Sequence, residues 1–170
     1  PVTQGTSKKD ADERARELIS IVGLDERAFD RYPHEFSGGQ RQRIGIARSL
    51  ALKPEILIAD EPVSALDVSI QAQILDLLEE IRDQMNLSMI FITHDLRVAA
   101  QVCDRLAVMR YGEVVETGAT ADIFANPQHG YTRDLLAAVP GKDWKSSAKP
   151  KKSAAKKAAP KKKQTKQNKQ

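Results

Sequence analysis

Ile56-Leu57-Ile58-Ala59-Asp60-Glu61 is the stretch that decides the fold of this chain. Four consecutive apolar residues are typical of a strand buried on both faces of a parallel sheet, here ending in two carboxylates. Ligands of doubly wound sheets bind beyond the carboxyl ends of the strands. That position suits Asp60 to hold Mg²⁺, directly or through water, and Glu61 to orient or deprotonate an attacking water. By itself the pattern is weak, and an acidic turn after a strand is the simpler interpretation.

Helix and strand patterns alternate on both sides of this stretch. Residues 89–92 predict a second buried strand, and further strands are expected at about 105–109 and 113–117. Apolar residues at helical spacing predict helices at 10–22, 40–52, 69–86, about 95–102, 120–125 and 131–138. Such alternation predicts an α/β fold with a mainly parallel sheet.

The charge of the chain is divided between two regions. Residues 141–170 carry twelve lysines and one acidic residue, whereas residues 1–140 carry 15 basic and 22 acidic side chains. The basic pI of 9.2 therefore belongs to the tail and does not indicate that the folded part binds nucleic acid. The tail has no apolar periodicity and is predicted to be disordered. A solvated extension is the simpler interpretation of its charge, and weak contact with nucleic acid or anionic lipid is the alternative.

Cysteine content and hydropathy restrict the class of protein further. The single cysteine, Cys103, excludes an internal disulfide and a cysteine-only metal site. No apolar run approaches the roughly 18 residues that a bilayer span needs, so a soluble protein is expected. Any association with a membrane would then depend on a partner or on the tail.

Ser37-Gly38-Gly39-Gln40 stands at a predicted helix start. Two glycines allow a phosphate close to the backbone, and the first turn of a helix offers unpaired N–H groups and the positive end of its dipole. Ser37 adds a hydroxyl donor. The segment is therefore a candidate γ-phosphate site without a catalytic group of its own, although a glycine-rich turn with a serine cap explains it equally well.

Two further patterns follow the acidic pair. Ser64-Ala65-Leu66-Asp67 precedes a predicted helix and, alone, is most simply a capped loop. His94 follows the second buried strand, where a neutral imidazole is able to donate a hydrogen bond to a transferring phosphate. A lone histidine at a strand end is more often structural.

The order and spacing of the four patterns argue against their occurring together by chance. Gln40 precedes Asp60 by 20 residues and Glu61 precedes His94 by 33, with helices and strands filling the gaps. Over about residues 10–140, the chain resembles the ATP-binding-cassette (ABC) ATPases. The matching segments are Phe36–Gln40 as the signature motif (with Phe where Leu is usual), residues 56–61 as the Walker B strand with the catalytic glutamate, Ser64–Asp67 as the D-loop and His94 as the switch histidine.

The resemblance implies a P-loop NTPase domain that uses ATP and Mg²⁺, with part of the helical signature subdomain at 10–52, the Walker B to switch-histidine core at 53–117 and a C-terminal importer-type segment at 118–140. It implies catalytic roles for Glu61 and His94 and a magnesium contact for Asp60. It implies nucleotide contacts for Ser37, Gly38, Gly39, Gln40 and Asp67. It also implies a head-to-tail dimer with a second ABC ATPase subunit, in which the signature of one subunit caps the ATP of the other. Transmembrane permease subunits would hold this dimer at the cytoplasmic face of the cell membrane.

The C-terminal segment narrows the resemblance. Residues 126–132 (Asn-Pro-Gln-His-Gly-Tyr-Thr) and the pairs Leu135-Leu136 and Val139-Pro140 resemble the oligopeptide and dipeptide importer ATPases. Those ATPases usually have Pro where Gly130 stands. Peptide import is therefore expected, with nickel as the open alternative for the cargo.

No Gly-Lys-Ser/Thr run occurs in residues 1–170. In the family, the strand leading into that phosphate-binding loop lies beside the strand that ends at His94, so an open sheet edge is expected here. We therefore expect a truncated cassette that is marginally stable and binds little ATP by itself.

Three functions remain open on the sequence. The leading one is an ATPase subunit that drives import, and the second is a non-transport relative acting on DNA or ribosomes. The third is a non-catalytic half-cassette that pairs with an intact ATPase and supplies only Ser37–Gln40. The Gly-Gly-Gln triplet of translation release factors is set aside, because there no Asp-Glu strand follows it.

Overall fold

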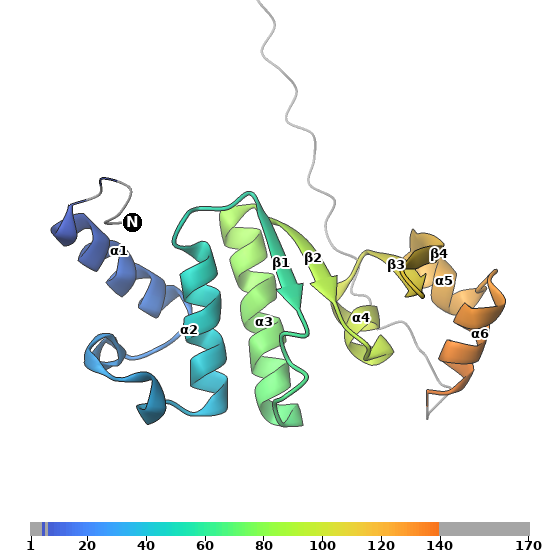
Figure 1. Cartoon of the computed structure of the whole chain (residues 1–170), viewed down its shortest axis with the longest axis horizontal. Helices are drawn as coiled ribbons and strands as arrows, with labels where there is room; N and C mark the ends of the chain where they lie inside the picture. Colours follow the sequence, from blue (N-terminus) through green and yellow to red (C-terminus); the bar gives the residue numbers. More distant parts are fainter. Residues whose placement is uncertain (1–4, 6, 140–170) are drawn as a thin grey trace, which may run out of the picture.

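The computed structural model describes residue 5 and residues 7–139 of the chain. The elements in chain order are α1 (Lys8–Ile21), η2 (Glu26–Asp30), η3 (Pro33–Glu35), α2 (Gly38–Leu50), β1 (Ile56–Asp60), α3 (Val68–Met85), β2 (Ser88–Ile92), α4 (Leu96–Val102), β3 (Arg105–Arg110), β4 (Glu113–Ala119), α5 (Thr120–Ala125) and α6 (Gly130–Ala137). Figure 1 shows them in an elongated row, with α1 and α2 at one end and α5 and α6 at the other. No helix in this part of the chain is long and apolar enough to cross a membrane.

The predicted elements are present, and their boundaries either coincide with the prediction or differ by one or two residues. The differences arise at helix starts, where a side chain caps the first turn one residue earlier than the apolar pattern indicates. Asp67, for example, caps α3 by accepting a hydrogen bond from the amide of Ile70 at 3.0 Å. The predictions for 141–170 concern residues outside the described part of the chain.

Two small sheets occur among the described residues. β1 and β2 pair in parallel, from Ile56 opposite Ser88 to Asp60 opposite Ile92. β3 and β4 instead form an antiparallel hairpin. Its turn is Tyr111-Gly112, with φ of 51° and 84°, and two left-handed residues match the twist of a tight hairpin. The parallel part of the predicted sheet is therefore β1 with β2 alone.

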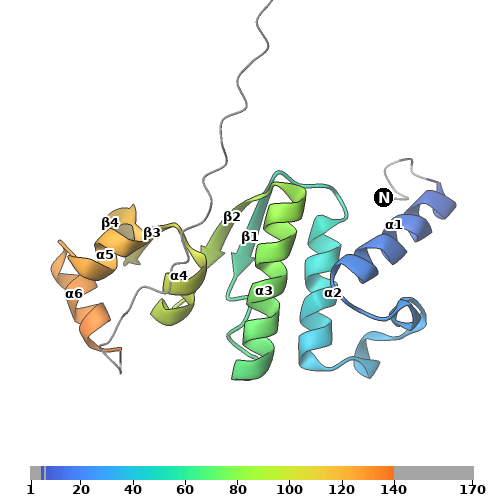
Figure 2. The same ribbon diagram turned by 180° about the vertical axis from the view of Figure 1, so that it is seen from behind.

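The prediction that both parallel strands are buried on both faces is wrong for this structure. Leu57 is only 8% exposed, but its neighbour Ile58 is 62% exposed and Ile90 on β2 is 52% exposed. Helix α3 packs on the face that contains Leu57, as Figures 1 and 2 show from opposite sides. A parallel sheet is normally covered by helices on both faces, and no described element covers the second one. This face therefore remains apolar and exposed.

The core lies between α1, α2, α3 and the covered face of the sheet. Its most buried side chains belong to these elements: Val22, Leu50, Ile74 and Ile81. Two arginines tie α1 to α2 through main-chain oxygens, because Arg14 donates to the carbonyl of Leu50 and Arg43 donates to that of Val22. These hydrogen bonds hold α1 against the middle and the end of α2.

Candidate active site

The four sequence patterns lie at one end of the fold. Helices α2 and α3 run side by side with their N-termini at the same end, at the bottom of Figure 1. Strands β1 and β2 also run toward that end. Because they are parallel, the residues that follow them, Glu61 and His94, emerge next to each other.

Glu61 and His94 are in direct contact. The carboxylate oxygen Oε1 of Glu61 lies 2.7 Å from Nδ1 of His94 and also accepts a hydrogen bond from the His94 amide at 3.1 Å. The pair is open to solvent, since the His94 side chain is 78% exposed. Oε2 of Glu61 has no hydrogen-bond partner among the described residues, so this oxygen is available to a water molecule. The arrangement suits a carboxylate that orients water and a histidine beside it.

The charge of His94 depends on this contact. The hydrogen bond with the Glu61 carboxylate, and then its negative charge, raise the pKa of the imidazole above 6.5. The sequence suggested a neutral imidazole as the phosphate donor. The geometry favours the charged form, in which Nδ1–H is directed at Glu61 and Nε2–H is able to donate to an anion.

The backbone of Glu61 is unusual. Its φ is 46°, in the left-handed region that residues other than glycine seldom occupy. Its amide donates to the carbonyl of Ile92 at 2.9 Å and so extends the pairing of β1 with β2 by one residue. The chain then turns sharply, with the amide and hydroxyl of Ser64 both donating to the Glu61 carbonyl. Backbone strain of this kind clusters at functional sites.

Asp60 was predicted to contact magnesium. Its carboxylate makes no hydrogen bond or ion pair with any described residue, and no group of three or more His, Cys, Asp or Glu converges within residues 5 and 7–139. A single carboxylate fits Mg²⁺ rather than a fully protein-ligated metal, because Mg²⁺ keeps several waters and binds substrate phosphates as well. The donor set is thus compatible with magnesium that arrives with a nucleotide.

The Ser37–Gln40 segment forms a capping box. The Ser37 hydroxyl accepts from the Gln40 amide at 3.3 Å, and the Gln40 side chain accepts from the Ser37 amide at 3.0 Å. Phe36, 6% exposed, anchors the segment in the core, which explains why a large apolar residue precedes the serine. The amides of Gly38 and Gly39 in the first turn have no intrahelical acceptor. They form a candidate cradle for an anion.

Asp67 has a structural role in the chain itself. Its carboxylate accepts from the amide of Ile70 and from the hydroxyl of Ser69 at 2.8 Å. These hydrogen bonds, that of Ile70 first, lower the pKa of Asp67 below 3.8. Any contact of Asp67 with nucleotide would therefore be made by an ionised carboxylate already engaged as a helix cap.

The structure joins some of the predicted residues and leaves others apart. It brings Glu61 and His94 together through 2.7 and 3.1 Å contacts. It also places the two signature glycines against the D-loop region, because a Cβ at Gly38 would lie 3.6 Å from Leu66. Among the described residues, no hydrogen bond or ion pair links the signature segment to Glu61 or His94. The signature segment and the Glu61–His94 pair therefore form separate sites within one chain.

Two residues with structural hydrogen bonds, one at the loop before α3 and one in the C-terminal part, were not found from the sequence. Gln71 donates to two carbonyl oxygens of the loop before α3, and Glu116 accepts from the amides of Gln128 and His129 in the C-terminal segment. The only signal for Gln71 is its position four residues after the helix cap Asp67. For Glu116 the partners lie more than ten residues away, and no local pattern indicates them.

Comparison with known proteins supports the resemblance. The family model described as ABC transporter matches residues 2–64. The oligopeptide transport ATP-binding protein OppF of Streptococcus mutans is 50% identical over 81% of this chain and 44% of its own length. The dipeptide transport ATP-binding protein DppF of Lactococcus lactis has the same identity and coverage, and a putative peptide import ATP-binding protein of Brucella ovis is 53% identical over 77% of this chain and 41% of its own length.

The fold also matches a solved structure. The ADP conformation of MJ1267, an ATP-binding cassette of an ABC transporter, superposes with a TM-score of 0.67 over 79% of this chain and 52% of that one, at 21% sequence identity. The predicted α/β cassette fold is thereby confirmed. The chain spans less than half the length of the curated relatives that it matches.

Proposed function

Since this chain is a relative of the ABC transporter ATPases and has the fold of their cassette, we propose that it forms part of the ATP-hydrolysing subunit of a peptide importer. The relatives named for oligopeptide and dipeptide transport support peptides as the cargo. In this proposal the subunit pairs with a second ATPase subunit and with membrane permeases, at the cytoplasmic face of the membrane.

The observation that carries the proposal is the contact of Glu61 with His94 at the ends of two adjacent parallel strands. There Glu61 orients the attacking water through Oε2, and the imidazolium of His94 donates through Nε2 to the γ-phosphate. Asp60, next to Glu61, contacts the magnesium of Mg-ATP. Each role uses an atom that the described residues leave accessible.

The signature segment serves a different nucleotide. The amides of Gly38 and Gly39 and the Ser37 hydroxyl bind the γ-phosphate of ATP held by the partner subunit, as the resemblance implies. No hydrogen bond joins this segment to the Glu61–His94 pair among the described residues. This supports the assignment of the two sites to separate nucleotides, because neither site holds the other in place directly.

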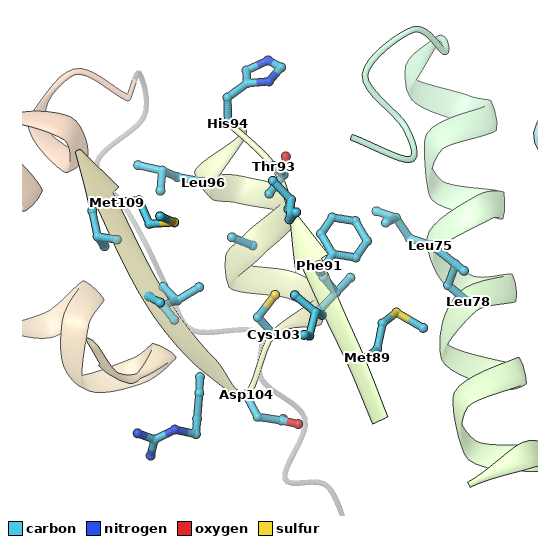
Figure 3. A pocket seen from close by; sticks show the side chains of 18 of the residues that line it. Leu75, Leu78, Met89, Phe91, Thr93, His94, Leu96, Cys103, Asp104 and Met109 are labelled. Atoms are coloured by element: carbon cyan, nitrogen blue, oxygen red, sulfur yellow. The ribbon is translucent and has the colours of Figure 1, made fainter. Parts of the chain in front are cut away.

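A strand leading to a phosphate-binding loop would complete the sheet. A cavity of about 860 Å³ lies between β2 and β3, and Figure 3 shows the two strands on either side of it, with Leu96, Cys103 and Met109 around it. Met89 and Phe91 also line the cavity, on the side of β2 that faces α3. We propose that this strand pairs with the outer edge of β2, which places its loop beside Glu61 and His94.

A nucleotide titration tests the proposed function. Mg-ATP is added to the 170-residue chain alone and to the chain mixed with the phosphate-loop portion of a related ATPase. We expect tight binding and hydrolysis only in the mixture, with hydrolysis lost in Glu61→Gln and retained in Glu80→Gln, a control on the exposed side of α3.

Other outcomes assign other functions. Hydrolysis by the chain alone, abolished by Glu61→Gln, would overturn the requirement for a phosphate-loop strand. If the mixture binds ATP but Glu61→Gln hydrolyses it as fast as the unaltered chain, the non-catalytic half-cassette is the better description. In that case only substitutions at Ser37 to Gln40 should reduce the activity of an intact partner ATPase.

A further inference from the structure

The loop between β1 and α3 is held by a side chain of α3. The side-chain amide of Gln71 donates to the carbonyl of Val63 at 2.9 Å and to that of Leu66 at 3.0 Å. Both donors of one NH₂ group are thus used on one loop. The Gln71 side chain is half-buried, so these bonds are partly shielded from competing water.

The same loop touches the signature segment. The Leu66 side chain lies 3.6 Å from where a Cβ would stand on Gly38, and Cγ2 of Ile70 lies 2.7 Å from the corresponding position on Gly39. A side chain at Gly39 does not fit there. Residues on both sides of Asp67 therefore pack against the two glycines whose amides form the candidate anion cradle.

The loop also begins at the acidic pair. Its first turn closes on the carbonyl of Glu61, through the amide and hydroxyl of Ser64. Its second turn closes through the amide of Leu66 on the carbonyl of Val63, which is the same oxygen that Gln71 contacts. Among the described residues, Gln71 is the one residue outside the loop whose side chain forms hydrogen bonds with the loop backbone between Glu61 and the signature glycines.

We infer that Gln71 is a positioning residue that holds the Ser64–Asp67 loop in register with the signature glycines, so that the Glu61 site and the anion cradle keep a fixed relative placement. The functional part of this inference rests on the proposed function, in which the two sites act on two nucleotides of one dimer. Its structural part is independent of that proposal. Loss of the two donors releases the Val63–Leu66 turn, and Leu66 then no longer locates Gly38.

The test compares two glutamines of the same helix. Gln71→Glu keeps the size of the side chain but replaces its donors with an acceptor that repels both carbonyls, whereas Gln71→Lys keeps a donor. Gln73→Glu makes the same chemical change on the exposed side of α3 and serves as the control. All three are made in the 170-residue chain labelled with ¹³C and ¹⁵N.

The first readout is the hydrogen bonds themselves. In Gln71→Glu the ¹³C carbonyl shifts of Val63 and Leu66 should change. The rate of hydrogen exchange at the Leu66 amide should rise about tenfold, because the free energy of one hydrogen bond corresponds to about a tenfold change in the opening equilibrium. Exchange at Leu77 and Leu78 should stay unchanged, and Gln71→Lys should restore part of the protection. Unchanged carbonyl shifts, or equal acceleration along all of α3, would overturn the inference.

The second readout is activity with the phosphate-loop portion added. Gln71→Glu should lower kcat about tenfold with little change in the KM for Mg-ATP, because the nucleotide is still bound while the two sites are misaligned. A proportional rise in KM, or a loss of activity equal to that of Gln73→Glu, would contradict a positioning role. If the unaltered mixture is inactive, the proposed function fails, while the carbonyl shifts still decide the structural part.

Discussion

At the scale of single residues, the site depends on one carboxylate that serves two purposes. Glu61 fixes the start of the segment after β2 through the His94 amide and holds the imidazole through the same oxygen. Its left-handed backbone, φ 46°, turns the chain out of β1 and makes both contacts compatible. Substitution of Glu61 should therefore change the position and the pKa of the His94 ring more than it changes the fold.

We predict that Glu61→Gln lowers the pKa of His94 toward 6.5, because the hydrogen bond to a carboxylate and its charge are the main causes of the raised value. The sign follows from linkage: the pair stabilises the folded chain fully below pH 6.5, and the contribution is lost as the pH rises through the raised pKa. An NMR titration of the His94 ring measures this.

Glu80→Gln supplies the control for that titration, since Glu80 lies exposed on α3 and forms no hydrogen bond or ion pair with His94. A pKa of His94 that is the same in the Glu61→Gln variant as in the unaltered chain would show that Glu61 does not hold the ring in solution.

At the scale of elements, close contact between α2 and α3 depends on glycine. A Cβ on Gly39 would lie 2.7 Å from Cγ2 of Ile70, and that methyl belongs to a stiff β-branched side chain. Gly45 lies on the same helix with nothing within 4 Å of a Cβ. Gly39 and Gly45 thus provide a matched pair of positions for substitution by alanine.

We predict opposite effects for alanine at these two positions. Gly39→Ala should destabilise the chain by about 1–3 kcal/mol, the usual cost of overpacking. Gly45→Ala should stabilise it by about 0.5–1 kcal/mol, because alanine is the better helix former. Denaturant unfolding of the two variants measures both, and equal effects at the two positions would mean that α2 and α3 do not approach as closely as described.

The C-terminal segment contacts the hairpin through the side chains of Glu116 and Arg110. Glu116 on β4 accepts from the amides of Gln128 and His129 at 2.8 and 3.1 Å. The neighbouring Thr132 side chain, whose hydroxyl nevertheless has no hydrogen-bond partner by geometry, and then the hydrogen bond from the Gln128 amide lower the pKa of Glu116 below 4.5. In addition, the guanidinium of Arg110 lies 4.8 Å from the centre of the Tyr131 ring.

We predict that α6 detaches from β4 in acid. Because the pKa of Glu116 is lowered in the folded chain, its contribution is present above pH 4.5 and is lost as the pH falls through the lowered value. The amide resonances of Gln128 and His129 should report this, and Glu116→Gln should weaken the attachment at neutral pH. Glu113→Gln, on the same strand, should not; equal behaviour of the two variants would argue against the contact.

At the scale of the whole molecule, the exposed sheet face is the main departure from a self-sufficient fold. Ile58 and Ile90 are 62% and 52% exposed on the face that no described helix covers, whereas Leu78 beneath the other face is 3% exposed. A buried aliphatic side chain contributes roughly 1.5–3 kcal/mol, against a total stability of about 5–15 kcal/mol for a domain. The free energy that is not gained because several isoleucines on this face stay exposed is therefore a large fraction of the total stability of a domain.

We predict that Ile90→Thr changes the free energy of unfolding of the chain alone by less than about 1 kcal/mol, while Leu78→Ala costs about 2–5 kcal/mol. If the phosphate-loop portion also covers this face when it is added, Ile90→Thr should weaken binding of that portion. Calorimetric titration and denaturant unfolding measure the two effects. A cost for Ile90→Thr as large as that of Leu78→Ala in the chain alone would show that the second face is already buried.

The order of helices and strands follows from the sequence because it depends on neighbours. Apolar spacing placed α2 and α3, and the two short apolar runs placed β1 and β2, each within a few residues. The signature, acidic pair and His94 were also recognisable, since their residue types and spacings lie along the chain itself.

Tertiary structure alone decided which of these residues meet. The contact between Glu61 and His94, which are 33 residues apart in the sequence, requires two strands to pair in parallel. The double hydrogen bond of Gln71 requires a loop to fold back on the helix that follows it. The sequence predicted strands that are buried on both faces. Burial, however, depends on what packs against each face of the sheet. An apolar run such as residues 56–59 has the same pattern whether one face is covered or both are. Local chemistry determines the elements of this protein, and the packing of distant segments determines its contacts and its exposed face.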